Sequence, residues 1–216
     1  MPHPANSPHK GQPILLAGEP LETAKAAMIL IHGRGATAES ILSLVPEIDQ
    51  PGFAYLAPQA ANYTWYPNSF LMPIQSNEPG LSSALAVIED ILAHINGAGV
   101  PPEKVVFLGF SQGACLSSEF VARHAQHYGG LAGLSGGLIG PNGTPRDYPG
   151  SLTSTPIFLG CSDVDPHIPK ERVLESSDIF RKLGAEMTTR LYPNMGHTVN
   201  EDELEAVRAM MSVLVK

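Results

Sequence analysis

Ser111 has the sequence surroundings of an activated nucleophile. It stands at the centre of residues 109–113 (GFSQG), directly after the apolar, β-branched run 105–108 and directly before a stretch with helical character. This order predicts a strand, a sharp turn and a helix, with the serine hydroxyl exposed at the carboxyl edge of a sheet. The flanking glycines let the backbone turn tightly and let the helix pack close to the strand. A serine held in this way is suited to attack a carbonyl carbon.

The acid of a catalytic set is expected in a loop that follows a later strand. A serine hydroxyl needs a base to take its proton, and that base needs an acid to orient it. In α/β-hydrolases, which carry their nucleophile in the same strand-turn-helix context, the chain order is Ser, then Asp or Glu, then His. The apolar run 157–160 leads into a loop that offers two carboxylates, Asp163 and Asp165.

The base is expected one strand further on. The predicted strand 187–192 leads into a loop that contains His197, so order and location both fit. His167 lies within the acid loop and is the rival base. Five other histidines are poorer candidates for the base, because they lie in the amino-terminal arm or in predicted helices: His3, His9, His94, His124 and His127.

Two backbone N–H groups must also bind the oxygen that becomes negatively charged on the attacked carbonyl. One is expected from Gln112, the residue after the nucleophile, and the second from the loop after an earlier strand. Residues 32–35 (HGRG) follow the apolar run 26–31 in that place, which makes Arg34 the second donor. The guanidinium of Arg34 could also attract a substrate carboxylate at the mouth of the site. A solvated or locally salt-bridged arginine is the alternative interpretation.

Apolar runs typical of strands alternate with segments of helical spacing along the whole chain. The predicted strands are 14–17, 26–31, 53–57, 105–108, 130–135, 157–160 and 187–192, and the predicted helices are 38–48, 81–95, 114–127, 170–183 and 201–214. This alternation predicts an α/β fold with a mostly parallel central sheet and helices on both faces. We expect a flexible arm over residues 1–12 and a single domain over 13–216. Only the loops 60–79 and 140–155 could cover the site, so the expected cap is minimal.

Composition restricts the class of protein and its partners. The chain has 216 residues, 43% of them hydrophobic and 16% charged, which is typical of a globular domain. The net charge of −8 argues against nucleic acid or an anionic membrane surface as the main partner. No run approaches the roughly 20 apolar residues of a membrane helix, and residues 1–11 do not resemble a secretory signal. We therefore expect a cytoplasmic protein. Two cysteines are too few for a disulfide framework, so we expect Cys115 and Cys161 to be buried free thiols.

These motifs, in this order, resemble the phospholipase/carboxylesterase branch of the α/β-hydrolases, which also holds acyl-protein thioesterases. The resemblance covers residues 26–214, and the residues that carry it are His32, Gly33, Gly35, Trp65, Tyr66, the segment 109–113, Gly160, Asp163, Asp165, Pro166, Ile168, Pro169, Gly196 and His197. It implies a triad of Ser111, Asp165 and His197, since the family's acid stands just before a proline, and Asp163 then shapes the loop. It implies no metal and no organic cofactor, and it implies that a homodimer can form, because small hydrolases of this branch are often dimers.

The resemblance implies a serine carboxylesterase that cleaves small-to-medium carboxylic esters through an acyl-enzyme. Family thioesterases commonly carry aspartate after the Trp-aromatic pair, whereas Pro67 and Asn68 follow it here, which favours small esters. An acyl thioesterase or lysophospholipase is the alternative among enzymes, and a non-catalytic ligand-binding protein on the same scaffold is the alternative of another class. Side chains that could line an acyl or alcohol pocket, or else pack in the core, are Trp65, Leu71, Met72 and Ile168.

Overall fold

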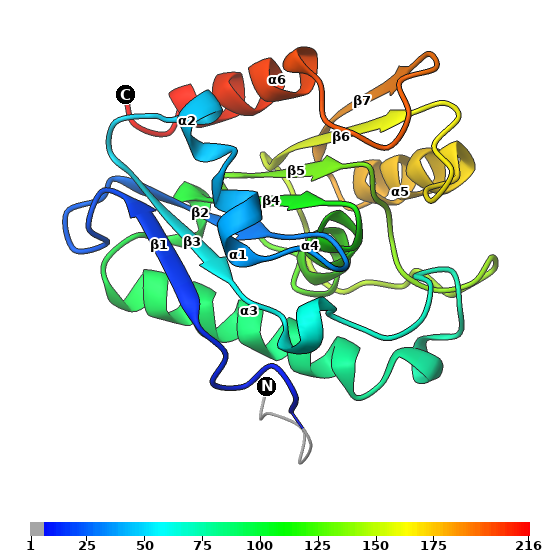
Figure 1. Ribbon diagram of the computed structural model, residues 1–216. Helices are drawn as coiled ribbons and strands as arrows, with labels where there is room; N and C mark the ends of the chain where they lie inside the picture. The colour runs from blue at the N-terminus through cyan, green and yellow to red at the C-terminus, as the bar shows by residue number, and fades with distance from the viewer. Residues whose placement is uncertain (1–6) are drawn as a thin grey trace.

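A seven-stranded sheet runs through the middle of the molecule (Figure 1). The computed structural model describes residues 7–216. The strands are β1 (Ile14–Gly18), β2 (Ala26–Ile31), β3 (Phe53–Pro58), β4 (Val105–Phe110), β5 (Gly130–Leu134), β6 (Pro156–Ser162) and β7 (Glu186–Tyr192). Their order across the sheet is β1-β3-β2-β4-β5-β6-β7, with β1 antiparallel to β3 and every other neighbouring pair parallel. The predicted mostly parallel α/β architecture is confirmed.

Helices cover both faces of the sheet. The helices α3 (Gly80–Gly97), α4 (Gln112–Arg123) and α5 (Lys170–Lys182) pack on one face, and α1 (Ala38–Leu42), α2 (Val45–Ile48) and α6 (Glu201–Ser212) pack on the other. Short 3-10 helices lie at Ala61–Tyr63, Ile74–Asn77 and Pro102–Lys104. Each face therefore has its own hydrophobic cluster, with the sheet between them.

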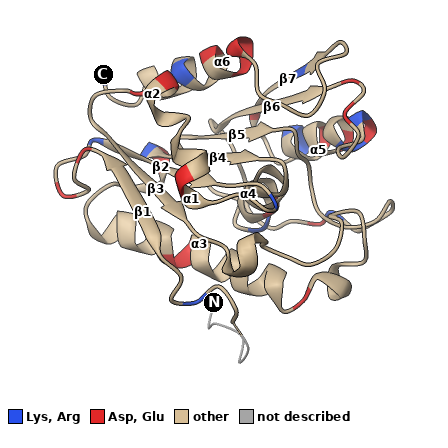
Figure 2. Cartoon of the chain, viewed as in Figure 1, with Lys and Arg blue, Asp and Glu red and all other residues tan. Residues whose placement is uncertain are grey.

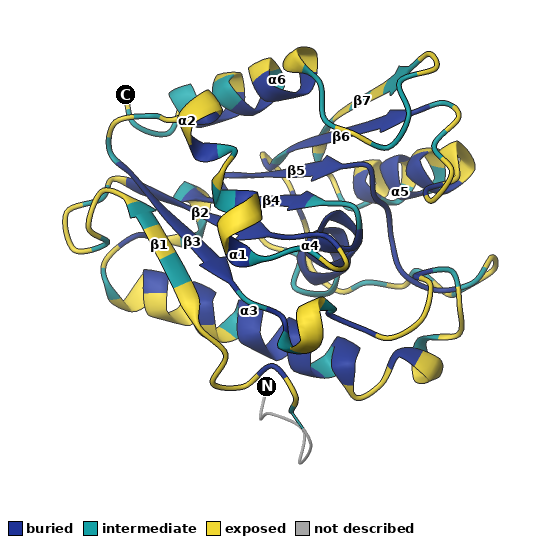
Figure 3. Ribbon diagram, viewed as in Figure 1, coloured by how far each residue is buried: buried dark blue, intermediate teal, exposed yellow. Residues whose placement is uncertain are grey.

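The central strands of the sheet are buried to a greater extent than the edge strands. The strands β2 to β5 are buried almost throughout, whereas exposed and half-buried residues alternate along β1 and most of β7 (Figure 3). No charged residue occurs in β2 to β6, and the charges lie on helices, loops and the edge strand β7 (Figure 2). Unbroken apolar runs are what a parallel strand covered on both faces needs.

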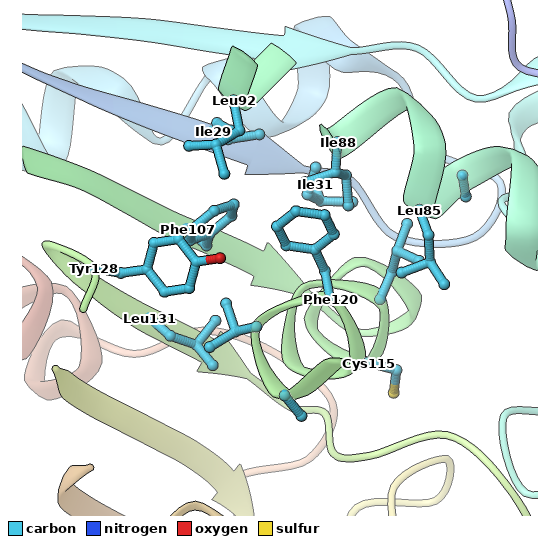
Figure 4. Packing of buried hydrophobic residues seen from close by; sticks show 14 of the residues in the cluster. Ile29, Ile31, Leu85, Ile88, Leu92, Phe107, Cys115, Phe120, Tyr128 and Leu131 are labelled. Atoms are coloured by element: carbon cyan, nitrogen blue, oxygen red, sulfur yellow. The ribbon is translucent and has the colours of Figure 1, made fainter. Parts of the chain in front are cut away.

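Aromatic packing under β4 holds the helix that follows the proposed nucleophile (Figure 4). The Phe107 ring lies 5.4 Å from that of Phe120 on α4 and 5.1 Å from that of Tyr128, the latter edge-on. All three side chains are fully buried, and such aromatic pairs stabilise a fold beyond their area burial. The carboxyl-terminal half of α4 is thereby fixed against the middle of β4.

Two predicted helices are shorter than expected. The predicted helix 38–48 is two helices, α1 and α2, with a break at Ser43 and Leu44. Pro46 explains the break, because it has no N–H to donate and its ring clashes with the preceding helical turn. The predicted helix 114–127 ends at Arg123, since the backbone of His124 leaves the helical region and its carbonyl accepts the Tyr128 hydroxyl at 2.7 Å.

The expected flexible arm, residues 1–12, is anchored in its described part. His9 is 3% exposed and its backbone N–H donates to Oγ of Ser83 at 3.0 Å. Its ring donates to the carbonyl of Trp65 at 2.9 Å and accepts the N–H of Ala61 at 3.1 Å. His9 is therefore held by contacts with three residues distant in the sequence. The first six residues, His3 among them, lie outside the described part.

Glu203 is a buried carboxyl in the first turn of α6. Its Oε2 accepts the N–H of Asn200 at 2.9 Å in a capping box. Its Oε1 lies against Gly160 of β6 and has no hydrogen-bond partner among residues 7–216. Burial raises the pKa of this carboxyl to about 7, against the opposing effect of the Asn200 hydrogen bond.

Glu203→Gln is expected to flatten the pH dependence of stability. Because the folded pKa lies above the unfolded value, the proton on Glu203 stabilises the fold at low pH, and this stabilisation is lost as pH rises through about 7. Between about pH 5 and about pH 8, the variant should lose on the order of 2 kcal/mol less unfolding free energy than the parent. Urea unfolding at both pH values measures the difference, and equal losses in the two proteins would contradict the expectation.

Candidate active site

The backbone at Ser111 is strained in the way the sharp turn requires. Its φ of 55° and ψ of −118° lie outside the regions that side-chain-bearing residues prefer. The turn is held by the Ser111 N–H, which donates to Leu134 of β5 at 3.0 Å, and by its carbonyl, which accepts the N–H of Cys115 at 3.0 Å. A Cβ added at Gly113 would lie 2.0 Å from the carbonyl oxygen of Ile31, so α4 approaches β2 as closely as only glycine permits.

Asp165 and His197 form a hydrogen-bonded pair at the carboxyl ends of β6 and β7. The His197 Nδ1 lies 2.7 Å from Oδ2 of Asp165. The other carboxylate oxygen accepts the N–H groups of His167 at 2.8 Å and Ile168 at 3.0 Å. Burial by itself would raise the pKa of Asp165, but the hydrogen bonds from His197 and from the two amides outweigh it, so this pKa is lowered. The carboxylate is therefore ionised at neutral pH and aimed at one ring nitrogen of His197.

The imidazole of His197 lies between two other rings. Its centroid is 4.9 Å from that of Phe110 and 4.9 Å from that of His167, the latter edge-on. Since Nδ1 is held by Asp165, Nε2 is the nitrogen left for a substrate or for the hydroxyl of Ser111, and Ser111 and His197 line one cavity. His167 contributes its backbone N–H to Asp165, and its ring makes no hydrogen bond within residues 7–216. The structure thus pairs His197, not the rival His167, with the acid.

Asp163 ties the acid loop to the histidine loop. Its Oδ1 accepts the N–H of Asn194 at 2.9 Å and its own N–H donates to Tyr192 at 3.0 Å. The neighbouring Ser162 hydroxyl accepts the N–H of Gly196 at 3.3 Å. Asp163 makes no hydrogen bond to His197, so its contacts are those of a residue that shapes the loop.

Arg34 and Gln112 both line the cavity that contains Ser111. Their backbone N–H groups are the donors that the sequence predicts. Neither N–H meets a hydrogen-bond acceptor within the part of the chain that the structure describes, residues 7–216. Unpaired N–H groups beside a serine hydroxyl can bind an oxygen that gains negative charge. The structure therefore places both residues that the sequence predicts as donors at one cavity, and their role remains a prediction.

His32 and Trp65 hold the loop that carries Arg34. The buried His32 ring donates from Nδ1 to the carbonyl of Gly33 at 2.7 Å and accepts the N–H of Ala60 on Nε2 at 3.1 Å. The indole N–H of Trp65 donates to the carbonyl of His32 at 2.9 Å. Desolvation of the buried ring lowers the pKa of His32, which keeps Nε2 available as an acceptor.

The side chain of Gln112 fixes the facing segment of the loop. Its Oε1 accepts the N–H of Trp65 at 2.9 Å, and its Nε2 donates to the carbonyl of Tyr66 at 2.9 Å. The residue after the nucleophile therefore joins the nucleophile turn to the loop that walls the cavity. The loops expected to cover the site also meet, because the N–H of Gly140 donates to the carbonyl of Phe70 at 2.7 Å.

The guanidinium of Arg34 is occupied by the same loop. It donates from Nη1 to Oγ1 of Thr64 at 3.0 Å and to the carbonyl of Pro67 at 2.9 Å, and from Nη2 to the carbonyl of Asn68 at 2.6 Å. The guanidinium is therefore anchored to the neighbouring loop by hydrogen bonds and not by the local salt bridge that was one interpretation of the sequence.

Arg34→Ala is expected to lower kcat/KM by about tenfold on neutral and anionic esters alike, because three hydrogen bonds that hold the cavity wall are lost. Kinetics on ethyl butyrate and on monoethyl succinate, at low and high salt, measure the effect. A KM increase confined to the anionic ester and shrinking with salt would show instead that the guanidinium attracts substrate.

The cavity at Ser111 has a volume of about 640 Å³. Of the four side chains expected to line it, only Ile168 does. Trp65 is fully buried beneath the loop, Leu71 packs on the core, and Met72 is 47% exposed and outside the cavity wall. Apolar and aromatic wall residues that the sequence did not single out as lining are Tyr66, Phe70, Phe110 and Cys115.

Both cysteines are free and buried, as predicted. Within residues 7–216, no three His, Cys, Asp or Glu side chains are grouped so that they could hold a metal ion. No helix of the described chain combines the length and apolar character that crossing a bilayer requires.

A strained serine between a parallel strand and a helix, with an Asp-His pair after later strands, defines the fold as that of an α/β-hydrolase. The chain belongs to the phospholipase/carboxylesterase family, whose model matches residues 17–215.

Relatives of this family resemble the chain along nearly all of its length. It is 27% identical to acyl-protein thioesterase 1 of Debaryomyces hansenii over 89% of this chain and 93% of the relative, and 28% identical to that of Candida albicans over 90% and 94%. The crystal structure of a phospholipase/carboxylesterase from Dyadobacter fermentans matches with a TM-score of 0.90 and 40% identity, covering 95% of this chain and 97% of that one. The chain is therefore an esterase-type enzyme of the serine hydrolase class.

Proposed function

We propose that this enzyme hydrolyses small-to-medium carboxylic esters through an acyl-enzyme, with Ser111 as nucleophile, His197 as general base and acid, and Asp165 as the orienting carboxylate. The observation that carries this proposal is the 2.7 Å contact between His197 and Asp165 at the wall of the cavity that contains Ser111. A base needs this support to take a proton from serine.

In the first half of the reaction, Oγ of Ser111 attacks the ester carbonyl carbon while Nε2 of His197 accepts the hydroxyl proton. The ionised Asp165 stabilises the imidazolium that forms. The N–H groups of Arg34 and Gln112 stabilise the oxyanion. The carbon–oxygen bond to the alcohol then breaks, His197 returns the proton to the alcohol oxygen, and the acyl group remains on Ser111.

In the second half, water attacks the acyl-enzyme and His197 takes the proton of that water. The N–H groups of Arg34 and Gln112 also stabilise the second oxyanion. When the bond to Oγ breaks, His197 gives its proton back to Ser111, and the carboxylic acid leaves. The acid–base steps are thus performed by one histidine and one carboxylate.

Carboxylic esters of modest length are the substrates that the site supports best. A cavity of about 640 Å³ is of the size that holds small organic ligands, and its apolar wall includes Tyr66, Phe70 and Ile168. An acyl thioesterase is the second candidate, because curated relatives of similar length carry that name. A lysophospholipase would need the same chemistry with a longer acyl chain.

Kinetics on esters and on thioesters of the same acyl groups distinguish the carboxylesterase from the thioesterase and the lysophospholipase. We expect p-nitrophenyl esters of two to eight carbons to be cleaved with higher kcat/KM than thioesters of the same acyl groups, and kcat/KM to fall for acyl chains of about 12 carbons or more. Labelling of Ser111 by a fluorophosphonate reports the activated nucleophile independently of substrate choice. Higher kcat/KM on the thioester or long-chain series would favour the second candidate, and the absence of both labelling and turnover would reject the proposal.

A further inference from the structure

A second cavity lies on the α1 side of His197. Its volume is about 470 Å³, and its apolar lining consists mainly of Ile41, Leu44, Phe110 and Val199. We call it the α1 groove. It lies next to the cavity at Ser111, because both are lined by Gly33, Ala36, Phe110 and His197.

The two cavities differ in which reacting groups they contain. Ser111, Arg34 and Gln112 border only the first cavity, whereas His197 borders both. In acyl transfer, the carbonyl carbon lies against the nucleophile and its oxygen against the oxyanion donors. The leaving oxygen must lie beside the histidine that protonates it. The group attached to that oxygen therefore lies next to His197, the side chain that the first cavity shares with the α1 groove.

We propose that the α1 groove binds the alcohol half of the ester, as an uncharged alkyl or aryl group. This assignment rests on the proposed function and deepens it. The acyl half then occupies the first cavity, between Tyr66, Phe70 and Ile168.

The walls of the groove are suited to an apolar group. Ile41 is 4% exposed within the hydrophobic cluster under α1, α2 and α6, and Leu44, Phe110 and Val199 pack against that cluster. The Phe110 ring is also in contact with the His197 ring, with centroids 4.9 Å apart. Because the core supports these side chains, the groove is preformed and binding costs little reordering.

The residues that line the α1 groove restrict which alcohols it can bind. Among residues 7–216, no Lys, Arg, Asp or Glu lines the α1 groove. Its two histidines are hydrogen-bonded elsewhere, His32 to the backbone of Gly33 and Ala60, and Nδ1 of His197 to Asp165. A phosphorylated or zwitterionic alcohol would meet no charged partner there, so it would lose solvation without replacement. Uncharged aliphatic and aromatic alcohols are therefore the expected leaving groups.

The test fills the α1 groove with a larger side chain and compares kcat/KM within two pairs of esters. Ethyl butyrate against 3-phenylpropyl butyrate changes only the alcohol, and ethyl butyrate against ethyl octanoate changes only the acyl group. Leu44→Trp is expected to lower the ratio of kcat/KM for 3-phenylpropyl over ethyl butyrate by about tenfold and to leave the octanoate-to-butyrate ratio unchanged. Leu42→Trp is the matched control, since Leu42 is also half-buried but lies outside the groove, and it should change neither ratio.

The smaller variant Leu44→Ala keeps the test decisive if tryptophan prevents folding, and it should lower the alcohol ratio several-fold through lost contacts. An unchanged alcohol ratio in the folded variants would overturn the assignment, as would a shift in the acyl ratio alone, which would place the acyl half in the groove. Failure of the wild type to cleave any ester or to be labelled by fluorophosphonate would be a failure of the proposed function itself.

Discussion

Ser111→Ala is expected to lower kcat for p-nitrophenyl butyrate by on the order of 10⁴-fold or more. The variant keeps the His197–Asp165 pair and both N–H donors, but no oxygen remains to attack the carbonyl carbon or to carry the acyl group. Members of a triad act as a unit, so the remaining groups recover little of the rate. Steady-state kinetics and loss of fluorophosphonate labelling measure the effect.

The fold should survive the change, because alanine keeps the Cβ and so meets the same backbone strain at φ 55° as serine does. Circular dichroism and Tm check this. Ser117→Ala is a matched control: Ser117 lies on α4, and its hydroxyl donates to the carbonyl of Gly113 at 2.8 Å, away from the reacting groups. It should keep near-normal kcat. Retention of most activity in folded Ser111→Ala would reject Ser111 as the nucleophile.

Most of the fold could be predicted because the sheet is buried on both faces. Unbroken apolar runs such as 26–31 and 105–108 have no polar residue that could face water, so they are strands of a covered sheet. Helix ends could not be predicted equally well. The spacing of apolar residues over 38–48 is helical throughout, and the break there depends on one proline, Pro46, and on how the chain turns before it.

The reacting residues could be predicted because a parallel sheet brings the carboxyl ends of its strands to one edge. Ser111, Asp165 and His197 each follow a strand, so strand order alone places them close together. The cavity wall could not be predicted in this way. Residues 60–79 have no period, and the inward position of Trp65 is set by bonds to His32 and Gln112, which the sequence does not reveal.

The amino-terminal segment shows the same limit of sequence patterns. His9 belongs to a polar, proline-rich stretch without periodicity, which predicts an arm with few contacts. In the structure its ring is buried because its two nitrogens meet a carbonyl of Trp65 and an N–H of Ala61. Such pairing depends on how residues distant in sequence meet in the fold.

The second large effect is expected from Asp165→Asn, which should lower kcat by about 10⁴-fold at every pH from about 5 to about 9. The side-chain oxygen of asparagine can still accept the N–H groups of His167 and Ile168, which turns its NH₂ group toward His197. Nδ1 of His197 must then become an acceptor, and the ring proton moves to Nε2. A protonated Nε2 cannot take the proton of Ser111. Because this is a change of tautomer, raising the pH should not restore activity.

Asp163→Asn is the matched control and should keep kcat within about tenfold of the parent. The carboxylate of Asp163 accepts one N–H, from Asn194 at 2.9 Å, and an amide oxygen can accept the same bond. The two aspartates stand two residues apart in one loop, so a general disturbance of that loop would affect both variants equally. Near-normal turnover in Asp165→Asn together with an inactive Asp163→Asn would reverse the assignment. Large losses in both would show that the loop, and not the charge on Asp165, limits the rate.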